Sequence, residues 1–203
     1  MKIHKNTLKD FGYVYIEDVY TENELLDITK EIENLTWMMD NVPNIQDNRN
    51  AESAHHNNGT PKMTGNGVMV DYVYQNRECS PILTHNKKVI LGEVADEMAS
   101  SHPANASVYQ TKSDWTCLNK YKYGHEYASH NDTSSFTAIT FLSLKDTEME
   151  GGDFVFTDYD ITFKFKNNTA VFFPSWVFHH CTKLESTNAV RYSIAQFSCI
   201  SYL

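Results

Sequence analysis

The residues with the clearest capacity for chemistry are a histidine and an aspartate two positions apart, His130 and Asp132, and a histidine pair further along, His179 and His180. On an extended segment, residues i and i+2 point to the same side, so the His130 imidazole and the Asp132 carboxylate can converge on one metal ion. A histidine from a neighbouring strand would complete one face. Two histidines and a carboxylate that leave other coordination positions open are typical of non-haem iron(II) sites.

The adjacent histidines raise the question of which one binds. Consecutive side chains on a strand face opposite ways, so only one of His179 and His180 can reach the metal. The same ligand types also suit catalytic zinc, and a metal-binding module without turnover is a further alternative.

Arg191 points to an anionic ligand. It is one of three arginines in the chain and lies within the apolar segment VRYSIAQF, where a buried cation needs an anionic partner. The guanidinium fork matches a carboxylate, such as that of a dicarboxylic acid. A structural salt bridge to an Asp or Glu side chain is the alternative.

The first part of the chain is predicted to be largely helical. Residues 21–24, Thr-Glu-Asn-Glu, form a capping box, and apolar residues follow it at helical spacing. A second helix is predicted over 81–101, although Gly92 weakens it. Residues 41–67 are rich in Asn, Gly, Ser and His, and we expect a long loop there, either a lid or a disordered insertion.

The second part is predicted to be mainly β. Short apolar and aromatic segments are separated by turn residues, and residues 161–165 alternate between apolar and polar side chains. A strand is also predicted at 12–16, and the Gly151-Gly152-Asp153 triplet is expected to be a tight turn with positive φ. Many short strands with regular turns favour a sandwich or barrel. The predicted segments are SVYQT, WTCLNKYKY, FTAITFLSL, DFVFT, ITFKFK, TAVFFP, WVFHHC and VRYSIAQFSCI.

Four motifs follow one another in the second part of the chain: YKYGHEYASHND, GGDFVF, FFPSWVFHH and RYSIAQF. The prolyl 4-hydroxylase-like branch of the 2-oxoglutarate and iron(II)-dependent oxygenases has such motifs in the same order. Over residues 115–197 this chain resembles that branch. The resemblance implies a double-stranded β-helix, or jelly-roll, core. The expected fold is mainly β with flanking helices (α+β). We expect one domain, 1–203, with a helical support and lid region at 1–105 and the core at 106–203.

The resemblance also assigns roles to individual residues. It implies that His130 and Asp132 bind iron, and the spacing after F-P-S selects His179 as the third ligand. Arg191 corresponds to the basic residue that binds the far carboxylate of 2-oxoglutarate, a position where many prolyl hydroxylase-like relatives carry Lys. Two further residues, Ser193 and Tyr121, are expected to contact the same carboxylate.

The implied cofactors are iron(II) and 2-oxoglutarate, with ascorbate as a reductant. The implied reaction hydroxylates an unactivated carbon of a prolyl or other side chain in a peptide or protein. The same chemistry on a free amino acid or small metabolite is the alternative. Nucleic acid is not expected as a substrate, because relatives that act on it carry R-x5-R and here Phe197 follows Arg191 at that position.

Composition excludes several other classes. The formal net charge is -9, which disfavours a strong grip on phosphate backbones. The sequence contains no stretch of about 18 apolar residues, so no membrane span is expected. The start has no apolar signal segment, and we therefore expect a cytoplasmic location. The four cysteines show no C-x-x-C pairing and are predicted to be free thiols. The sequence does not indicate the oligomeric state.

Overall fold

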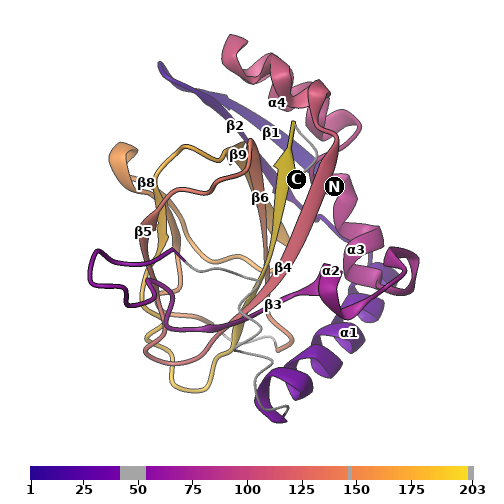
Figure 1. The fold of residues 1–203 in the computed structure, drawn as a ribbon, viewed down its shortest axis with the longest axis vertical. Helices are drawn as coiled ribbons and strands as arrows, with labels where there is room; N and C mark the ends of the chain where they lie inside the picture. The colour runs from indigo at the N-terminus through magenta and orange to yellow at the C-terminus, as the bar shows by residue number, and fades with distance from the viewer. Residues whose placement is uncertain (42–53, 146–147, 201–203) are drawn as a thin grey trace.

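Two antiparallel sheets form the framework of the protein, which a computed structural model describes at residues 1–41, 54–145 and 148–200 (Figure 1). The major sheet contains, in spatial order, β1 (Lys2–Thr7), β2 (Gly12–Glu17), β9 (Thr169–Pro174), β6 (Phe136–Leu142), β11 (Arg191–Cys199), β4 (Ser113–Tyr121) and β3 (Asn66–Met69). The minor sheet contains β5 (Tyr127–His130), β10 (His179–Cys181), β7 (Phe154–Phe156) and β8 (Ile161–Phe163). The mainly β jelly-roll prediction is confirmed.

The major sheet draws strands from both halves of the chain. β1, β2 and β3 come from the part predicted to be mostly helical, and of these only β2 corresponds to a predicted strand. β2 pairs with β9 and extends the sheet towards β1, whereas β3 pairs with β4 at the opposite edge. The sheet is therefore completed by segments from earlier in the chain: Val14 of β2 precedes its partner Phe172 of β9 by 158 residues, and Val68 of β3 precedes Leu118 of β4 by 50.

Helix α1 (Glu22–Asn41) begins where the capping box predicts. The backbone N–H of Thr21 donates to the Glu24 carboxylate at 2.8 Å, and the N–H of Glu24 donates to Thr21 Oγ1 at 3.4 Å. These bonds satisfy amides that have no partner within the helix. None of the helices in the described ranges combines the length and apolar character needed to cross a bilayer.

The single helix predicted over 81–101 is wrong. The segment instead contains α3 (Pro81–His85), the 3-10 turn η2 (Asn86–Val89) and α4 (Glu93–Ser101). Gly92 has a φ of 58°, which a right-handed helix cannot contain, so α4 starts after it.

Residues 107–111 are not a strand as predicted: residues 107–110 belong to the 3-10 segment η3 (Pro103–Gln110), and Thr111 caps it. Proline at the first helical position favours that start, and the His102 side chain accepts a hydrogen bond from the Ala104 N–H. Three more short elements lie in the described ranges: α2 (Val70–Val73), η1 (Arg77–Cys79) and η4 (Thr157–Tyr159).

The predicted long loop falls partly outside the described residues, since 42–53 are not among them. From residue 54 to the start of β3, the chain contains isolated bridges rather than strands. One bridge joins Met63 to Tyr127 at the start of β5, and the Tyr127 hydroxyl accepts a hydrogen bond from the Ala54 N–H at 3.0 Å. This part of the segment is thus attached to the minor sheet.

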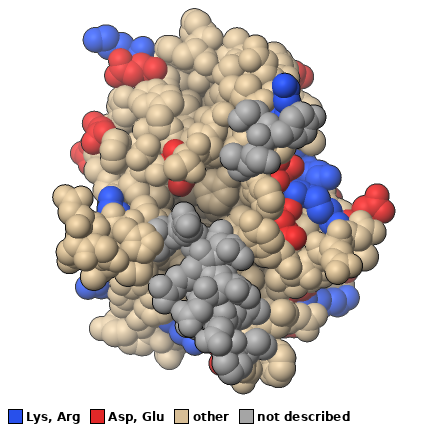
Figure 2. All heavy atoms as spheres, in the orientation of Figure 1, with Lys and Arg blue, Asp and Glu red and all other residues tan. Residues whose placement is uncertain are grey.

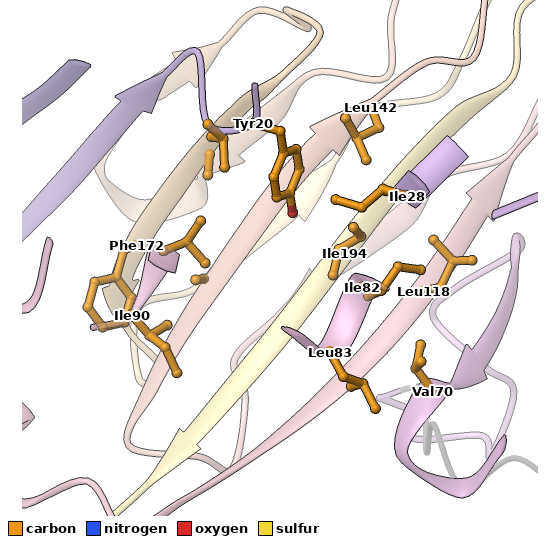
Figure 3. Close-up of a cluster of buried hydrophobic side chains, with 14 of the residues drawn as sticks. Tyr20, Ile28, Val70, Ile82, Leu83, Ile90, Leu118, Leu142, Phe172 and Ile194 are labelled. Carbon is orange, nitrogen blue, oxygen red and sulfur yellow. The ribbon is translucent and has the colours of Figure 1, made fainter. Parts of the chain in front are cut away.

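The main apolar core lies between the helices and one face of the major sheet (Figure 3). Ile28 of α1 and Ile82 of α3 are fully buried against Leu118 of β4 and Ile194 of β11. Burying a side chain of this size contributes about 1.5–3 kcal/mol. The other face of the sheet is therefore left free for the site.

A second, aromatic cluster fills one end of the space between the two sheets. Phe154 and Phe156 of the minor sheet contact Phe173 of the major sheet at centroid distances of 5.5 and 5.1 Å. The His179 ring packs 5.0 Å from Phe173 and 5.4 Å from Phe154. These contacts fix β10, which carries His179.

On the face shown in Figure 2, acidic and basic side chains are interspersed.

Candidate metal centre and adjoining cavity

Three predicted ligand residues meet between the sheets. His130 of β5 and His179 of β10 face each other in the antiparallel register, and their ring centroids are 4.3 Å apart. Asp132 follows the end of β5, and its N–H donates to the Ser175 carbonyl at 3.0 Å. The carboxylate oxygens of Asp132 lie 3.7 Å from His130 Nε2 and 3.6 Å from His179 Nε2. One ion can contact all three side chains at such separations.

Both imidazoles are oriented by the backbone. His130 Nδ1 donates to the Ala128 carbonyl and His179 Nδ1 donates to the Val177 carbonyl, each at 2.9 Å. Because a carbonyl only accepts, the proton must reside on Nδ1. Each Nε2 therefore carries a free lone pair directed at the shared position, as metal-binding histidines require.

The electrostatics of the three groups also suit a cation. Burial, together with the neighbouring His179, lowers the pKa of His130 to about 4, and burial lowers the pKa of His179 to about 4. Both rings are thus neutral near pH 7 and available as ligands. Burial raises the pKa of the Asp132 carboxyl, so the anion is unfavourable there without a positive partner.

A group of buried and half-buried hydroxyls supports Asp132 and was not predicted from the sequence. Thr137 of β6 donates to Asp132 Oδ2 at 2.6 Å, and its Oγ1 also lies 2.8 Å from the hydroxyl of Ser175. Ser134 Oγ is 2.6 Å from Ser175 Oγ. A threonine in a β-strand carries no sequence signal for such a contact.

His180 lies outside the group of three. It is partly exposed, and its Nδ1 is hydrogen-bonded to Thr157 Oγ1 at 2.9 Å. Its neighbours Trp176 and Phe178 are 50% and 44% exposed. The side chains whose ligand atoms converge are thus those of His130, Asp132 and His179, and His180 is not among them.

Arg191 is buried, and the described part of the chain provides no counter-charge for it. Only 2% of the residue is exposed, and its guanidinium lies 5.0 Å from the ring centre of Tyr121 and 5.1 Å from that of Phe141. Its Nε and Nη1 have no hydrogen-bond partner, and no carboxylate of residues 1–41, 54–145 or 148–200 forms an ion pair with it. A buried cation with unused donors is unfavourable by itself. An anion that entered the cavity could accept hydrogen bonds from these donors.

The glycine turn leaves room for this arginine. Gly151 and Gly152 have φ values of 73° and 70°, as predicted for a tight turn. A Cβ atom on Gly152 would lie 3.1 Å from Arg191 Cδ. A side chain here would be strained by its backbone and would also press on Arg191.

Arg191 and the three candidate ligands line one cavity of about 880 Å³. Tyr121 is opposite Arg191 in the register and lines the same cavity; its hydroxyl points to Met63 Sδ, 3.6 Å away, a weak acceptor. Ser193, on the same side of β11 as Arg191, is buried and also lines the cavity. Asn119, opposite Ser193, is a further polar lining residue that was not predicted.

Residues 116–199 match the family model described as the 2OG-Fe(II) oxygenase superfamily. His130, Asp132, His179 and Arg191 all fall within the matched region. A search of curated proteins found no match to the sequence.

Several solved structures share the fold. A Pseudomonas putida prolyl-4-hydroxylase is 14% identical, with 93% of this chain and 92% of that chain covered and a TM-score of 0.60. A Trichoplax adhaerens prolyl hydroxylase in complex with a hypoxia inducible factor peptide fragment is 12% identical, with 92% and 83% covered and a TM-score of 0.62. A Burkholderia pseudomallei oxidoreductase of the 2OG-Fe(II) oxygenase family is 13% identical, with 93% and 86% covered and a TM-score of 0.53. Because the three structures are only 12–14% identical to this chain, the similarity shows a shared fold.

Proposed function

Starting from the 2OG-Fe(II) oxygenase superfamily, to which residues 116–199 belong, we propose that this chain is an iron(II) and 2-oxoglutarate-dependent dioxygenase that hydroxylates an unactivated carbon. In this proposal His130, Asp132 and His179 hold the iron. Arg191 binds the C5 carboxylate of 2-oxoglutarate.

The donor set fits the proposed metal. Two neutral imidazoles and one carboxylate occupy one face and leave the remaining positions to other ligands, which suits iron(II) with a bidentate co-substrate. The backbone carbonyls behind both rings and the Thr137 hydroxyl behind Asp132 hold the donors in place.

The observation that carries the proposal is Arg191. A metal hydrolase or a simple metal-binding module needs no buried, unpaired guanidinium beside its ligands. A dicarboxylate that binds the metal at one end would satisfy the Nε and Nη1 donors with the other. Ser193 and Tyr121 line the same region and are proposed to contact that carboxylate.

When bound, iron(II) with 2-oxoglutarate and dioxygen supplies the oxidation, which yields succinate, carbon dioxide and a hydroxylated substrate. The chain itself contributes binding and orientation. Arg191 fixes the distal end of the co-substrate, and the rings of Tyr121 and Phe141 cover the guanidinium and exclude water from it. His130 and His179 stay neutral because they are buried, so their lone pairs remain available near pH 7.

For the substrate we propose a prolyl or other side chain of a peptide or protein. The Trichoplax adhaerens structure, which shares the fold, is described as a prolyl hydroxylase in complex with a peptide fragment. The cavity of about 880 Å³ is large enough for a side chain in addition to a small co-substrate.

Uncoupled turnover tests the reaction class. Purified protein with iron(II), 2-oxoglutarate, ascorbate and oxygen is expected to form succinate slowly without a prime substrate. In a separate assay with candidate peptides, a peptide that is hydroxylated should gain 16 daltons. The absence of succinate, together with the absence of a 2-oxoglutarate-dependent absorption band with iron(II) under anaerobic conditions, would rule the proposal out.

A further inference from the structure

Two aromatic rings outside the cavity pack on one buried phenylalanine. Trp176, in the turn between β9 and β10, is 50% exposed, and its ring lies edge-on to that of Phe11 at a centroid distance of 5.7 Å. The partly exposed Tyr159 of η4 packs edge-on against the same ring at 4.9 Å. Phe11 itself is fully buried. Because both rings contact Phe11, the centres of Trp176 and Tyr159 are at most 10.6 Å apart.

Backbone hydrogen bonds hold the segments that carry these rings. The N–H of Leu8 donates to the Phe11 carbonyl at 2.8 Å and closes the turn between β1 and β2. The N–H of Thr157, the first residue of η4, donates to the Phe178 carbonyl at 2.8 Å and joins η4 to the start of β10. The positions of the rings are therefore set by the fold.

Carboxylates border the same rings. Asp10 Oδ2 accepts a 3.4 Å hydrogen bond from the hydroxyl of Tyr159. Burial, and then the charges of Asp10 and Asp158, raise the pKa of Tyr159, so the Asp158 carboxylate also lies near this ring. Both aspartates are exposed, and neither forms an ion pair with any residue in the described part of the chain, the adjacent Lys9 included.

A cation is the ligand that suits exposed aromatic rings beside unpaired carboxylates. Aromatic faces attract an ammonium or guanidinium group, and tryptophan does so most strongly. The carboxylates add charge attraction and hydrogen-bond acceptors. Arginine can use both features, because its planar guanidinium stacks on a ring while its N–H groups donate to an oxygen. An apolar partner would instead remove water from the carboxylates without replacing it, which is unfavourable.

Two other exposed aromatic residues lack this combination. Trp37 is 63% exposed on α1 and contacts no aromatic ring of the described residues. Tyr109 is 64% exposed and donates to Asp96 at 2.9 Å, but no described ring lies beside it. These residues serve as internal comparisons, since each shares only one feature with the surface around Trp176.

We propose that Trp176 and Tyr159, together with the carboxylates of Asp10 and Asp158, form a docking surface for a basic side chain of a partner protein, arginine above all. None of the four residues lines the cavity that contains the candidate metal ligands, so the surface is separate from that site. The net charge of -9 favours the approach of a basic partner. The inference does not depend on the proposed reaction.

Titration of the full chain, labelled with ¹⁵N, with short peptides tests the surface by NMR. The chain has three tryptophans, Trp37, Trp115 and Trp176, whose indole N–H groups each give one signal, and Trp176→Phe identifies the one concerned. The probes are N-acetyl-Gly-Arg-Gly-amide and the same peptide with norleucine or glutamate in place of arginine. We expect the arginine peptide to shift the Trp176 signal saturably and to bind about 3- to 10-fold more tightly than the norleucine peptide. The glutamate peptide and the Trp37 signal should show no effect.

The double change Asp10→Asn with Asp158→Asn tests the role of charge. It alters exposed positions and keeps an acceptor for the Tyr159 hydroxyl, so thermal unfolding should be unchanged. The variant should bind the arginine peptide no more tightly than the norleucine peptide. Asp96→Asn is the matched control, because Asp96 also accepts a hydrogen bond from an exposed tyrosine, Tyr109. It should bind the arginine peptide as the wild type does.

Four outcomes would overturn the proposal. They are equal affinities for the arginine and norleucine peptides, equal shifts of the Trp37 and Trp176 signals, no effect of the double change, and no saturable binding of any probe. A shift of the Trp176 signal with protein concentration alone would also contradict it, because the surface would then join two copies of the chain.

Discussion

The hydroxyl of Thr137 donates a 2.6 Å hydrogen bond to Oδ2 of Asp132 from the adjacent strand β6. Thr137 is fully buried, and its oxygen is also 2.8 Å from Ser175 Oγ. Because this bond engages one carboxylate oxygen, it sets the rotation of the Asp132 side chain. Thr137 thus positions a proposed iron ligand without touching the metal.

We predict that Thr137→Val weakens metal binding by about 10- to 100-fold, the usual cost of losing a contact that orients a ligand. Titration with Co(II) gives the affinity, and thermal unfolding of the metal-free protein checks the fold. Thr137→Ser keeps the hydroxyl and should largely retain the affinity. Thr116→Val is the matched control, since Thr116 is equally buried and its Oγ1 has no partner. If Thr137→Val and Thr116→Val bind Co(II) alike, the positioning role is wrong.

Arg191→Met is expected to weaken 2-oxoglutarate by about 10- to 150-fold, which corresponds to roughly 1.5–3 kcal/mol for a lost charge-assisted pair. The same change should not destabilise the free protein, because it removes a buried cation whose Nε and Nη1 are unpaired. Calorimetry with Mn(II) and thermal unfolding measure the two effects.

Arg77→Met provides the contrast. Arg77 pairs with Asp71 and Asp114, so its loss should lower the free energy of unfolding. It should leave the affinity for 2-oxoglutarate unchanged. Reversal of this pattern would show that Arg191 stabilises the fold and does not bind the co-substrate.

Substitution of the adjacent histidines should have unequal effects. His179→Ala removes a buried lone pair aimed at the shared position, and we expect it to abolish the anaerobic absorption band of iron(II) with 2-oxoglutarate. His180→Ala removes a contact with Thr157 but none of the three converging side chains, and it should retain the band. The opposite result would assign the third ligand to His180.

Metal affinity should resist mild acid. Two histidines with an ordinary pKa of about 6.5 would each be about 90% protonated at pH 5.5, which would lower the affinity about 100-fold. Burial instead lowers the pKa of His130 and of His179 to about 4, so both rings stay neutral at pH 5.5. We expect Co(II) affinity to fall steeply only as the pH approaches about 4, where both rings take up protons, and the pKa of Asp132, raised by burial, acts in the same direction. Titrations of the protein with Co(II) at pH 7.5, 6.5 and 5.5 test this prediction. A 100-fold loss of Co(II) affinity by pH 5.5 would show that burial does not lower the two histidine pKa values.

The sequence predicted most strands of the C-terminal half and the identity of the residues that meet at the site. Strand periodicity is local, and the ordered motifs around His130, His179 and Arg191 are specific. The predictions failed where a short-range pattern was ambiguous. Residues 81–101 have helical spacing, but Gly92 ends the pattern; residues 107–111 resemble a strand, but Pro103 starts a 3-10 segment.

The tertiary structure alone decided how these residues are supported. That Arg191 is buried with no anionic partner among the described residues depends on which side chains surround it, and no spacing rule reports that. The contact from Thr137 to Asp132, and the meeting of Tyr72 with Trp115, join residues on different elements. The sequence by itself determined which chemical groups the protein carries. Only the folded chain determined their distances, their burial and their unused hydrogen-bonding capacity, because these quantities arise from packing between segments distant in sequence.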